Sequence, residues 1–292
     1  MKKVLITGID SFSGTHLSSY LVNAGYDVYG TSLFECGDKK YKCDITKKED
    51  IIAVLKSSKP DYLIHLSGIS FAAHGESEDF YKVNTIGTIN ILESFIELKM
   101  SPKKIILASS ATVYGNQGLE VLDESLCAKP TNHYGVSKYA MECLSSEYFG
   151  KLNIIITRPF NYTGINQQEH FLIPKIVKHF KEKRQTIELG NIHVSREFND
   201  VSYVCEIHKK LLESSAVSEV VNIASSRGIK LLDVIEMMQE IAGYEIEVKV
   251  NPAFVREGEI KTLTGSCEKL FGLIGKVEQK EFKETLRDML EA

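Results

Sequence analysis

The sequence lacks the features that mark membrane, secreted and low-complexity proteins. No stretch of its 292 residues approaches the roughly eighteen apolar residues that a membrane span requires, and no apolar segment precedes the first expected strand at Val4. No repeat or biased tract interrupts a composition that is 43% hydrophobic and 25% charged, which is typical of a globular protein. We therefore expect a soluble, cytoplasmic protein that does not bind membranes.

Metal-ligand and disulfide patterns are also missing. The six cysteines lie far apart without a C-x-x-C pair, and the eight histidines lack metal-ligand spacing, so we expect reduced thiols and no metal site. The net charge of -4 gives no general attraction to phosphate polymers, and the basic stretch at residues 178–184 is typical of a solvated helix end. Nucleic-acid binding is not expected.

Alternation of strand and helix patterns fills the first 160 residues. Short apolar runs alternate with segments of helical periodicity, which specifies a parallel sheet covered by helices on both faces. We predict a doubly wound α/β sheet of the Rossmann type. The expected strands are 4–6, 27–31, 62–66, 105–108 and 154–157, and the expected helices are 15–24, 51–55, 83–98 and 134–149.

This rhythm breaks after Pro159. Loops at 161–169 and 189–193 separate helices expected at 173–183 and 232–242. We predict a dinucleotide-binding domain over residues 1–160, to which later segments return, and a smaller mixed α/β substrate lobe over 161–292. Such a lobe would close a ligand site above the carboxyl ends of the strands.

Residues 7–14, Thr-Gly-Ile-Asp-Ser-Phe-Ser-Gly, join the first expected strand to the first expected helix. Backbone amides and a helix N-terminus bind the pyrophosphate of a dinucleotide at such a turn. Two glycines allow a tight turn, although Ser11 occupies the place of the usual middle glycine. The loop predicts a cofactor site at Gly8, Ser11, Phe12 and Gly14; its alternative is a glycine-bearing turn without a ligand.

The ends of later strands add to this site. Asp44 can accept a hydrogen bond from an adenine amino group, the small residues at 66–68 let a cofactor approach the backbone, and Asn84 opens a long helix, with N-terminal capping as its alternative role. The second strand ends at Ser32 without the acidic residue that binds the ribose of NAD, which slightly favours NADP and leaves both cofactors open. The remaining expected cofactor contacts are Ser32, Asp44, Ile45, Leu66, Ser67, Gly68, Asn84, Tyr134, Lys138 and Pro159.

Tyr134 and Lys138 lie four residues apart at the start of an expected helix, so they share one face. A nearby ammonium lowers the pKa of a tyrosine, which makes Tyr134 a proton donor or acceptor. Ser110 ends a strand and can bond the same substrate oxygen. These three residues are the predicted catalytic group.

The chain resembles the extended short-chain dehydrogenase/reductase superfamily, in its nucleotide-sugar branch. The resemblance rests on the glycine loop, Ser-Ser-Ala-Thr-Val-Tyr-Gly at 109–115, the Tyr134/Lys138 pair, Arg-Pro-Phe-Asn at 158–161, and the motifs at 196–201 and 256–259. It implies a nicotinamide cofactor, a homodimer formed by the helices at 83–98 and 134–149, and a nucleotide-diphosphate sugar as substrate. The implied substrate contacts are Ser70, Ser110, Thr112, Asn161, Arg196 and Arg256, with the two arginines on the diphosphate.

The resemblance also narrows the reaction. A 4,6-dehydratase of this family carries an acidic pair directly after the catalytic hydroxyl, where this chain has Ala111 and Thr112. Without carboxylates the elimination lacks its acid and base, so reduction or epimerisation remains. The segments at 191–198 and 251–256 look most like the reductases of GDP-4-keto-6-deoxy-mannose and their relatives.

We therefore expect an NAD(P)H-dependent reductase of the C4 ketone of a nucleotide-linked 4-keto-6-deoxyhexose, with Tyr134 protonating the forming alkoxide. The alternative is a nucleotide-sugar 4-epimerase that keeps NAD bound. A redox-sensing binding module is a third class, but such proteins tend to lose the tyrosine or the lysine, and this chain has both.

Overall fold

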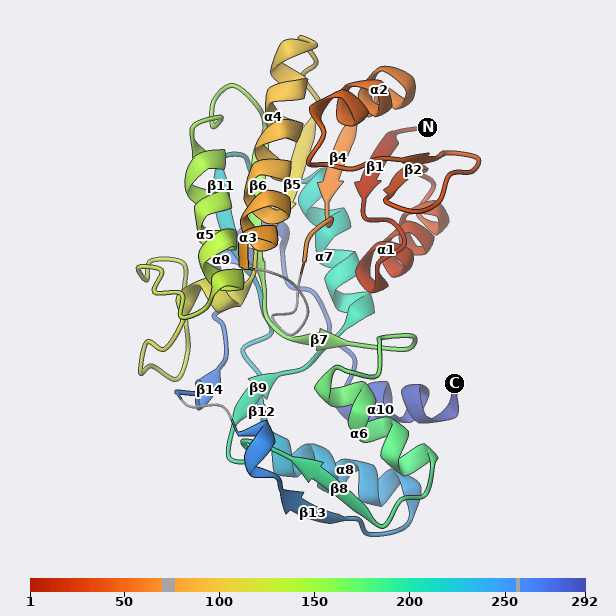
Figure 1. Cartoon of the computed structure of the whole chain (residues 1–292), viewed down its shortest axis with the longest axis vertical. Helices are drawn as coiled ribbons and strands as arrows, with labels where there is room; N and C mark the ends of the chain where they lie inside the picture. The colour runs from red at the N-terminus through yellow and green to blue at the C-terminus, as the bar shows by residue number, and fades with distance from the viewer. Residues whose placement is uncertain (70–76, 256–257) are drawn as a thin grey trace.

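A seven-stranded, entirely parallel sheet forms the centre of the larger lobe in the computed structural model, which describes residues 1–69, 77–255 and 258–292 (Figure 1). The strand order β11-β6-β5-β4-β1-β2-β3 reverses direction between β1 and β4, which is the doubly wound arrangement that the sequence predicts. The strands are β1 (Lys3–Thr7), β2 (Asp27–Ser32), β3 (Lys40–Lys42), β4 (Tyr62–His65), β5 (Lys104–Ala108), β6 (Ile154–Pro159) and β11 (Glu219–Ile223).

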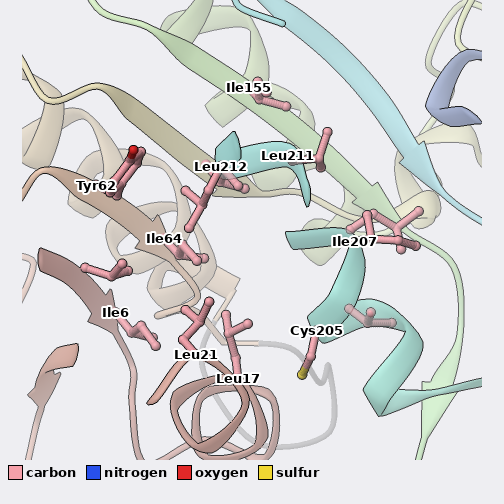
Figure 2. Close-up of a cluster of buried hydrophobic side chains, with 14 of the residues drawn as sticks. Ile6, Leu17, Leu21, Tyr62, Ile64, Ile155, Cys205, Ile207, Leu211 and Leu212 are labelled. Carbon is pink, nitrogen blue, oxygen red and sulfur yellow. The ribbon is translucent and has the colours of Figure 1, made fainter. Parts of the chain in front are cut away.

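Helices cover both faces of this sheet because the strand side chains alternate between the two faces. Val4 and Ile6 of β1 lie in one buried cluster with helices α1 and α7, and Leu5 lies in another with α2, α4 and α5. Figure 2 shows the first cluster, to which Leu17 and Leu21 of α1 and Ile207 and Leu211 of α7 contribute. The covering helices are α1 (Phe12–Asn23), α2 (Lys48–Ser58), α4 (Gly87–Glu97), α5 (His133–Ser146), α7 (Val201–Glu213) and α9 (Glu268–Ile274).

The helix expected at 83–98 is longer and less regular than its sequence pattern indicates. It begins as α3 (Ser77–Phe80), continues as a π-helical segment η1 (Tyr81–Ile86) and only then becomes α4. Asn84 therefore lies inside the helix, and both its expected position at the helix start and its alternative as a cap are wrong.

The smaller lobe lies beyond the carboxyl ends of β1 and β4 and has its own core (Figure 1). The amphipathic helix α6 packs Ile176 and Phe180 against α8 and α10, while β8 and β13 pair in parallel. Its elements are α6 (Leu172–Lys181), β8 (Thr186–Leu189), β9 (Ser195–Glu197), β12 (Gly228–Lys230), α8 (Leu231–Ala242), β13 (Glu247–Val250), η3 (Pro252–Phe254), β14 (Thr262–Leu263) and α10 (Phe282–Glu291).

The chain passes between the lobes several times. The short strands β7 (Tyr162–Thr163) and β10 (Asn199–Asp200) pair with each other, after which α7 and β11 return to the large sheet. The division at residue 160 stays a prediction. Over residues 1–69, 77–255 and 258–292, no helix has the length and apolar character to cross a membrane, and no three His, Cys, Asp or Glu side chains gather as metal ligands would.

Candidate active site

The glycine loop brings β1, β2 and the start of α1 into close contact. Gly8 has φ of +71°, and its amide donates to the Thr31 oxygen at 3.1 Å. A Cβ on Gly14 would lie 2.2 Å from the Gly8 oxygen, so only glycine fits there. Ser11 accepts a hydrogen bond from the Gly14 amide at 3.0 Å and thus caps α1. The residue that interrupts the glycine pattern therefore has a structural role of its own.

Small residues at the end of β4 complete a cradle beside this loop. A Cβ on Gly8 would lie 3.0 Å from the Ser67 amide nitrogen, and one on Gly68 would lie 3.3 Å from Lys138 Nζ. The backbone segments at the carboxyl ends of β1 and β4 thus lie close together, next to the N-terminus of α1. This arrangement fits a dinucleotide, whose pyrophosphate needs amide donors and close approach.

The hydroxyl groups of Ser110, Thr112 and Tyr134 converge at the end of β5. Ser110 caps the 3-10 helix η2 (Ala111–Tyr114), and its Oγ accepts from the Thr112 amide at 3.2 Å and from the Thr112 hydroxyl at 3.0 Å. Asn132 caps α5, which places Tyr134 in the first turn, where the Ser110 hydroxyl acts to lower the pKa of its phenol. The structure thus brings together two of the predicted catalytic residues and one predicted substrate contact.

Lys138 lies one turn further along α5 and is buried; its Nζ donates to the Ala108 oxygen at 2.7 Å. Burial lowers the pKa of Lys138 to about 8, and the Glu142 carboxylate opposes this shift. Burial raises the pKa of Tyr134 to about 12, while the hydrogen bond with Ser110 acts in the other direction. The pKa of Tyr134 in this structure is therefore raised, the reverse of the lowering expected from Lys138, because loss of hydration outweighs the other effects.

Asn84 occupies a different place from the one its sequence context suggests. Its side chain is buried and bridges three elements: Oδ1 accepts from the Ile69 amide at 2.9 Å, and Nδ2 donates to the Ile69 oxygen and to Ser137 Oγ. Ser137 lies between Tyr134 and Lys138 on α5. Asn84 thus joins the end of β4 to the helix that carries the predicted catalytic pair.

Charged residues surround Ser32 at the end of β2. Ser32 Oγ accepts from the amides of Phe34 and Glu35 and is hydrogen-bonded to Asp10. Lys40 Nζ pairs with Asp10 at 3.0 Å and with Glu35 at 2.7 Å. Two carboxylates and one ammonium therefore border Ser32, the position predicted to distinguish NAD from NADP.

The other expected cofactor contacts are distributed around this edge. Asp44 Oδ1 accepts from the Thr46 amide and hydroxyl, at 3.0 and 2.7 Å. Phe12 stacks on Tyr162 at 6.2 Å between ring centres, which brings β7 against the start of α1. Ile45 is buried, Leu66 packs against the sheet core, and Pro159 ends β6.

Of the predicted substrate contacts that the structure describes, only Ser110 and Thr112 lie together at the end of β5. Arg196 is buried and donates to Glu259 at 2.7 Å and to the Lys261 oxygen at 3.2 Å, so its charge is paired within the chain. Asn161 is exposed. Ser70 and Arg256 lie outside the described residues.

Two buried groups near the site were not anticipated. His65 ends β4 and bonds Thr7 and Thr88, and Glu142 binds Arg158 through two hydrogen bonds of 3.0 and 2.6 Å. The spacing of Glu142, one turn after Lys138, is a signal that the sequence does contain. For His65, the sequence contains no such signal apart from its position directly before the small residues at 66–68.

The comparisons agree with this geometry. The family model described as GDP-mannose 4,6 dehydratase matches residues 5–289. A GDP-6-deoxy-D-talose 4-dehydrogenase from Aggregatibacter actinomycetemcomitans is 35% identical over 94% of this chain and 91% of its own length. A GDP-6-deoxy-D-mannose reductase from Pseudomonas aeruginosa is 28% identical over 99% of this chain and 96% of its own.

A solved structure of RMD from Pseudomonas aeruginosa, complexed with NADPH, has a TM-score of 0.88 and 26% identity, and it covers 100% of this chain and 97% of its own. The resemblance stated from the sequence motifs, to the nucleotide-sugar branch of the short-chain dehydrogenases/reductases, is confirmed. The chain belongs to the GDP-mannose 4,6-dehydratase family of extended short-chain dehydrogenases/reductases.

Proposed function

We propose that this chain reduces the C4 ketone of a nucleotide-linked 4-keto-6-deoxyhexose. The observation that carries the proposal is the convergence of the Ser110, Thr112 and Tyr134 hydroxyls near Lys138, with Ala111 and Thr112 directly after Ser110 where a dehydratase has carboxylates. Ala111 is buried, so no acid or base enters from that position. The curated relatives named as a 4-dehydrogenase and a reductase support redox chemistry at a sugar carbon.

Each residue of this site has a separate role in the proposed reduction. When bound, the reduced nicotinamide supplies the electron pair of the reduction. Tyr134 holds its proton, because its pKa is about 12, and gives it to the alkoxide oxygen as that oxygen gains charge. Ser110 donates to the same oxygen, and Lys138 contributes a positive charge to the ribose side of the site.

The charges around Ser32 bear on the choice of cofactor. Asp10, Glu35 and Lys40 sum to one net negative charge where NADP carries its additional phosphate. We therefore expect tighter binding of NADH than of NADPH, the reverse of the preference inferred from sequence. Dissociation constants for both, in the wild type and in Asp10→Asn, test this: the variant should gain affinity for NADPH alone.

Arg196 is proposed to hold the diphosphate of the substrate, with Arg256 and Asn161, as the family resemblance implies. In this structure Glu259 neutralises Arg196. The substrate would have to replace this contact, because a guanidinium can form a bidentate pair with only one anion on a given edge.

The proposed homodimer and the cytoplasmic location stay predictions. The dimer has support in the apolar side chains that η1, α4 and α5 leave exposed: Ile86, Ile96, Val136, Tyr139 and Leu144. Light scattering of the purified chain measures the oligomeric state.

One assay tests the reaction itself. The oxidation of NADH and NADPH is followed with GDP-, dTDP-, CDP- and UDP-linked 4-keto-6-deoxy sugars, with the cofactor and product measured together. One cofactor consumed for each sugar reduced supports the reductase. Interconversion of sugars without net cofactor use would instead identify the 4-epimerase, since the same hydroxyl pair can serve both reactions.

A further inference from the structure

A line of buried hydrogen bonds runs from the cofactor edge of the sheet into the helix that contains Asn84. Thr7 and His65 are cross-strand partners in β1 and β4, and Thr7 Oγ1 lies 2.6 Å from His65 Nδ1. On the other side of the ring, His65 Nε2 lies 2.9 Å from Thr88 Oγ1. The two ends are backbone groups: the Ser67 amide donates to Thr7 Oγ1 at 3.2 Å, and Thr88 Oγ1 donates to the Asn84 oxygen at 2.8 Å.

Only one arrangement of protons satisfies this line. The Thr88 hydroxyl donates its one hydrogen bond to the backbone oxygen of Asn84, so toward His65 it can only accept. His65 must therefore carry its proton on Nε2. Nδ1 is then unprotonated and accepts a hydrogen bond from the Thr7 hydroxyl. Burial lowers the pKa of His65 to about 3, and the charge of Lys138 acts in the same direction, so the ring stays neutral.

At its helical end, the line of hydrogen bonds reaches η1, which is bonded to α5, the helix of the predicted catalytic pair. Asn84 lies in η1, a π-helical segment of the kind often found at functional sites. Its Nδ2 donates to Ser137 Oγ at 3.0 Å, and the neighbouring Thr85 donates to the Ser137 oxygen at 2.8 Å. The Ser137 hydroxyl in turn donates to the backbone oxygen of Tyr134 at 2.8 Å. Hydrogen bonds from η1 therefore hold α5 at a point between Tyr134 and Lys138.

We propose that His65 is a positioning residue that sets the register of α5 against the glycine loop. Through Thr7 it is tied to the strand that leads into Gly8, and through Thr88 it is tied to the turn that holds Ser137. His65 thereby fixes the distance between the bound cofactor and the Tyr134 hydroxyl without taking part in proton transfer. The catalytic consequence, though not the register itself, rests on the proposed reductase function.

The chain offers a matched control in His208. This second histidine is also buried and neutral, and its Nδ1 bonds the Val204 oxygen of its own helix α7 at 2.8 Å. It connects no second element to the site. Replacement of either ring by phenylalanine keeps an aromatic side chain and removes both nitrogens. The two variants therefore differ in one respect: His65→Phe breaks the hydrogen bonds to Thr7 and Thr88, whereas His208→Phe breaks only a bond within α7.

The first measurement needs no substrate. Nitrogen and proton NMR of the histidine rings should show His65 as the Nε2-protonated neutral form throughout pH 5–8. Titration of His65 in that range, or protonation on Nδ1, would overturn the inference. Because this readout uses the chain alone, it remains decisive even if no nucleotide sugar is turned over and the proposed reaction is wrong.

The second measurement compares kinetics. Misplacement of reacting groups by about 1 Å can cost about 100-fold in rate, so His65→Phe should lower kcat by 10- to 100-fold. The KM for the sugar nucleotide and the dissociation constant of NADH should change by less than about 3-fold, because the groups that bind them remain. His208→Phe should leave all three values near those of the wild type. Equal kcat values in His65→Phe and His208→Phe would contradict the proposal.

Two further variants separate positioning from a general loss of stability. His65→Gln retains one amide donor and one acceptor, and we expect it to recover part of the lost kcat. The double variant His65→Phe/Asn84→Ala should be no slower than the slower single variant, because both act along one line. Strictly multiplicative losses in the double variant would count against a shared line.

Discussion

Lys138 Nζ donates a hydrogen bond to the backbone oxygen of Ala108 at 2.7 Å, which ties the predicted catalytic helix to the carboxyl end of β5. Burial of this ammonium lowers its pKa to about 8. Lys138 is thus cationic below pH 8 and loses its charge as the pH rises further. Its charge would be available to the proposed cofactor only in the lower pH range.

The first prediction follows from this pKa. We expect kcat/KM for the reduced dinucleotide to be constant below pH 8 and to fall above it with the loss of one proton, since this quantity reports groups of the free enzyme. Lys138→Met should be slow and should show no such step. Lys104→Met is the control, because Lys104 is also buried but lies at the opposite end of β5. A wild-type profile that stays flat to pH 10 would contradict the assignment.

The second prediction concerns Tyr134. Tyr134→Phe removes the proposed proton donor, and we expect kcat to fall by at least about 100-fold, the usual contribution of a positioned acid. Binding of NADH, measured by fluorescence, should change by less than about 2-fold because the glycine loop is untouched. Tyr139→Phe, an exposed tyrosine on the same helix, should retain full activity. Normal turnover in Tyr134→Phe would remove Tyr134 from the mechanism.

The third prediction concerns the glycine loop. A Cβ at Gly14 would meet the Gly8 oxygen at 2.2 Å, whereas one at Gly37 would meet nothing within 4 Å. Gly14→Ala should therefore push α1 away from β1 and weaken NADH binding by at least about tenfold, or unfold the chain. Gly37→Ala should bind NADH normally. Calorimetric titration and the thermal midpoint distinguish these results, and unchanged binding in Gly14→Ala would contradict them.

The fourth prediction concerns the buried ion pair behind the site. Glu142 accepts two hydrogen bonds from Arg158 and one from Ser109. Glu142→Gln leaves the Arg158 charge uncompensated, so we expect the free energy of unfolding to drop by about 3–5 kcal/mol.

An exposed pair provides the control for this measurement. Lys276 and Glu278 are 3.2 Å apart in solvent, and Glu278→Gln should change the free energy of unfolding by no more than about 0.5 kcal/mol. Denaturant unfolding of both variants measures the difference. Equal stabilities would show that the buried pair contributes no more than a surface pair.

Much of the fold could be read from the sequence. The buried strands β1, β4, β5 and β6 are apolar and short, and the helices between them have clear periodicity, so their alternation predicts a parallel sheet. Elements such as β11 and α10 were not anticipated. Their residues become buried only against partners distant in sequence, and local periodicity cannot reveal such partners.

The predicted site shows the same division. Spacing along one helix placed Tyr134 and Lys138 together, but the sequence context of Asn84 suggested a helix start, because nothing local signals a π-helical turn. The raised pKa of Tyr134 also escaped prediction, since burial depends on how α5, η1 and β5 pack.

The sequence by itself thus determined the fold class, the glycine loop and the Ser110, Tyr134 and Lys138 group, because these depend on residue type and on spacing over a few turns. Only the tertiary structure decided that Ser11 is a helix cap, that Glu259 neutralises Arg196, and that His65 links Thr7 of β1 to Thr88 of α4. The contacts to Glu259 and across His65 join residues more than twenty positions apart, and a hydrogen bond depends on distance and angle in space, which residue order alone does not define.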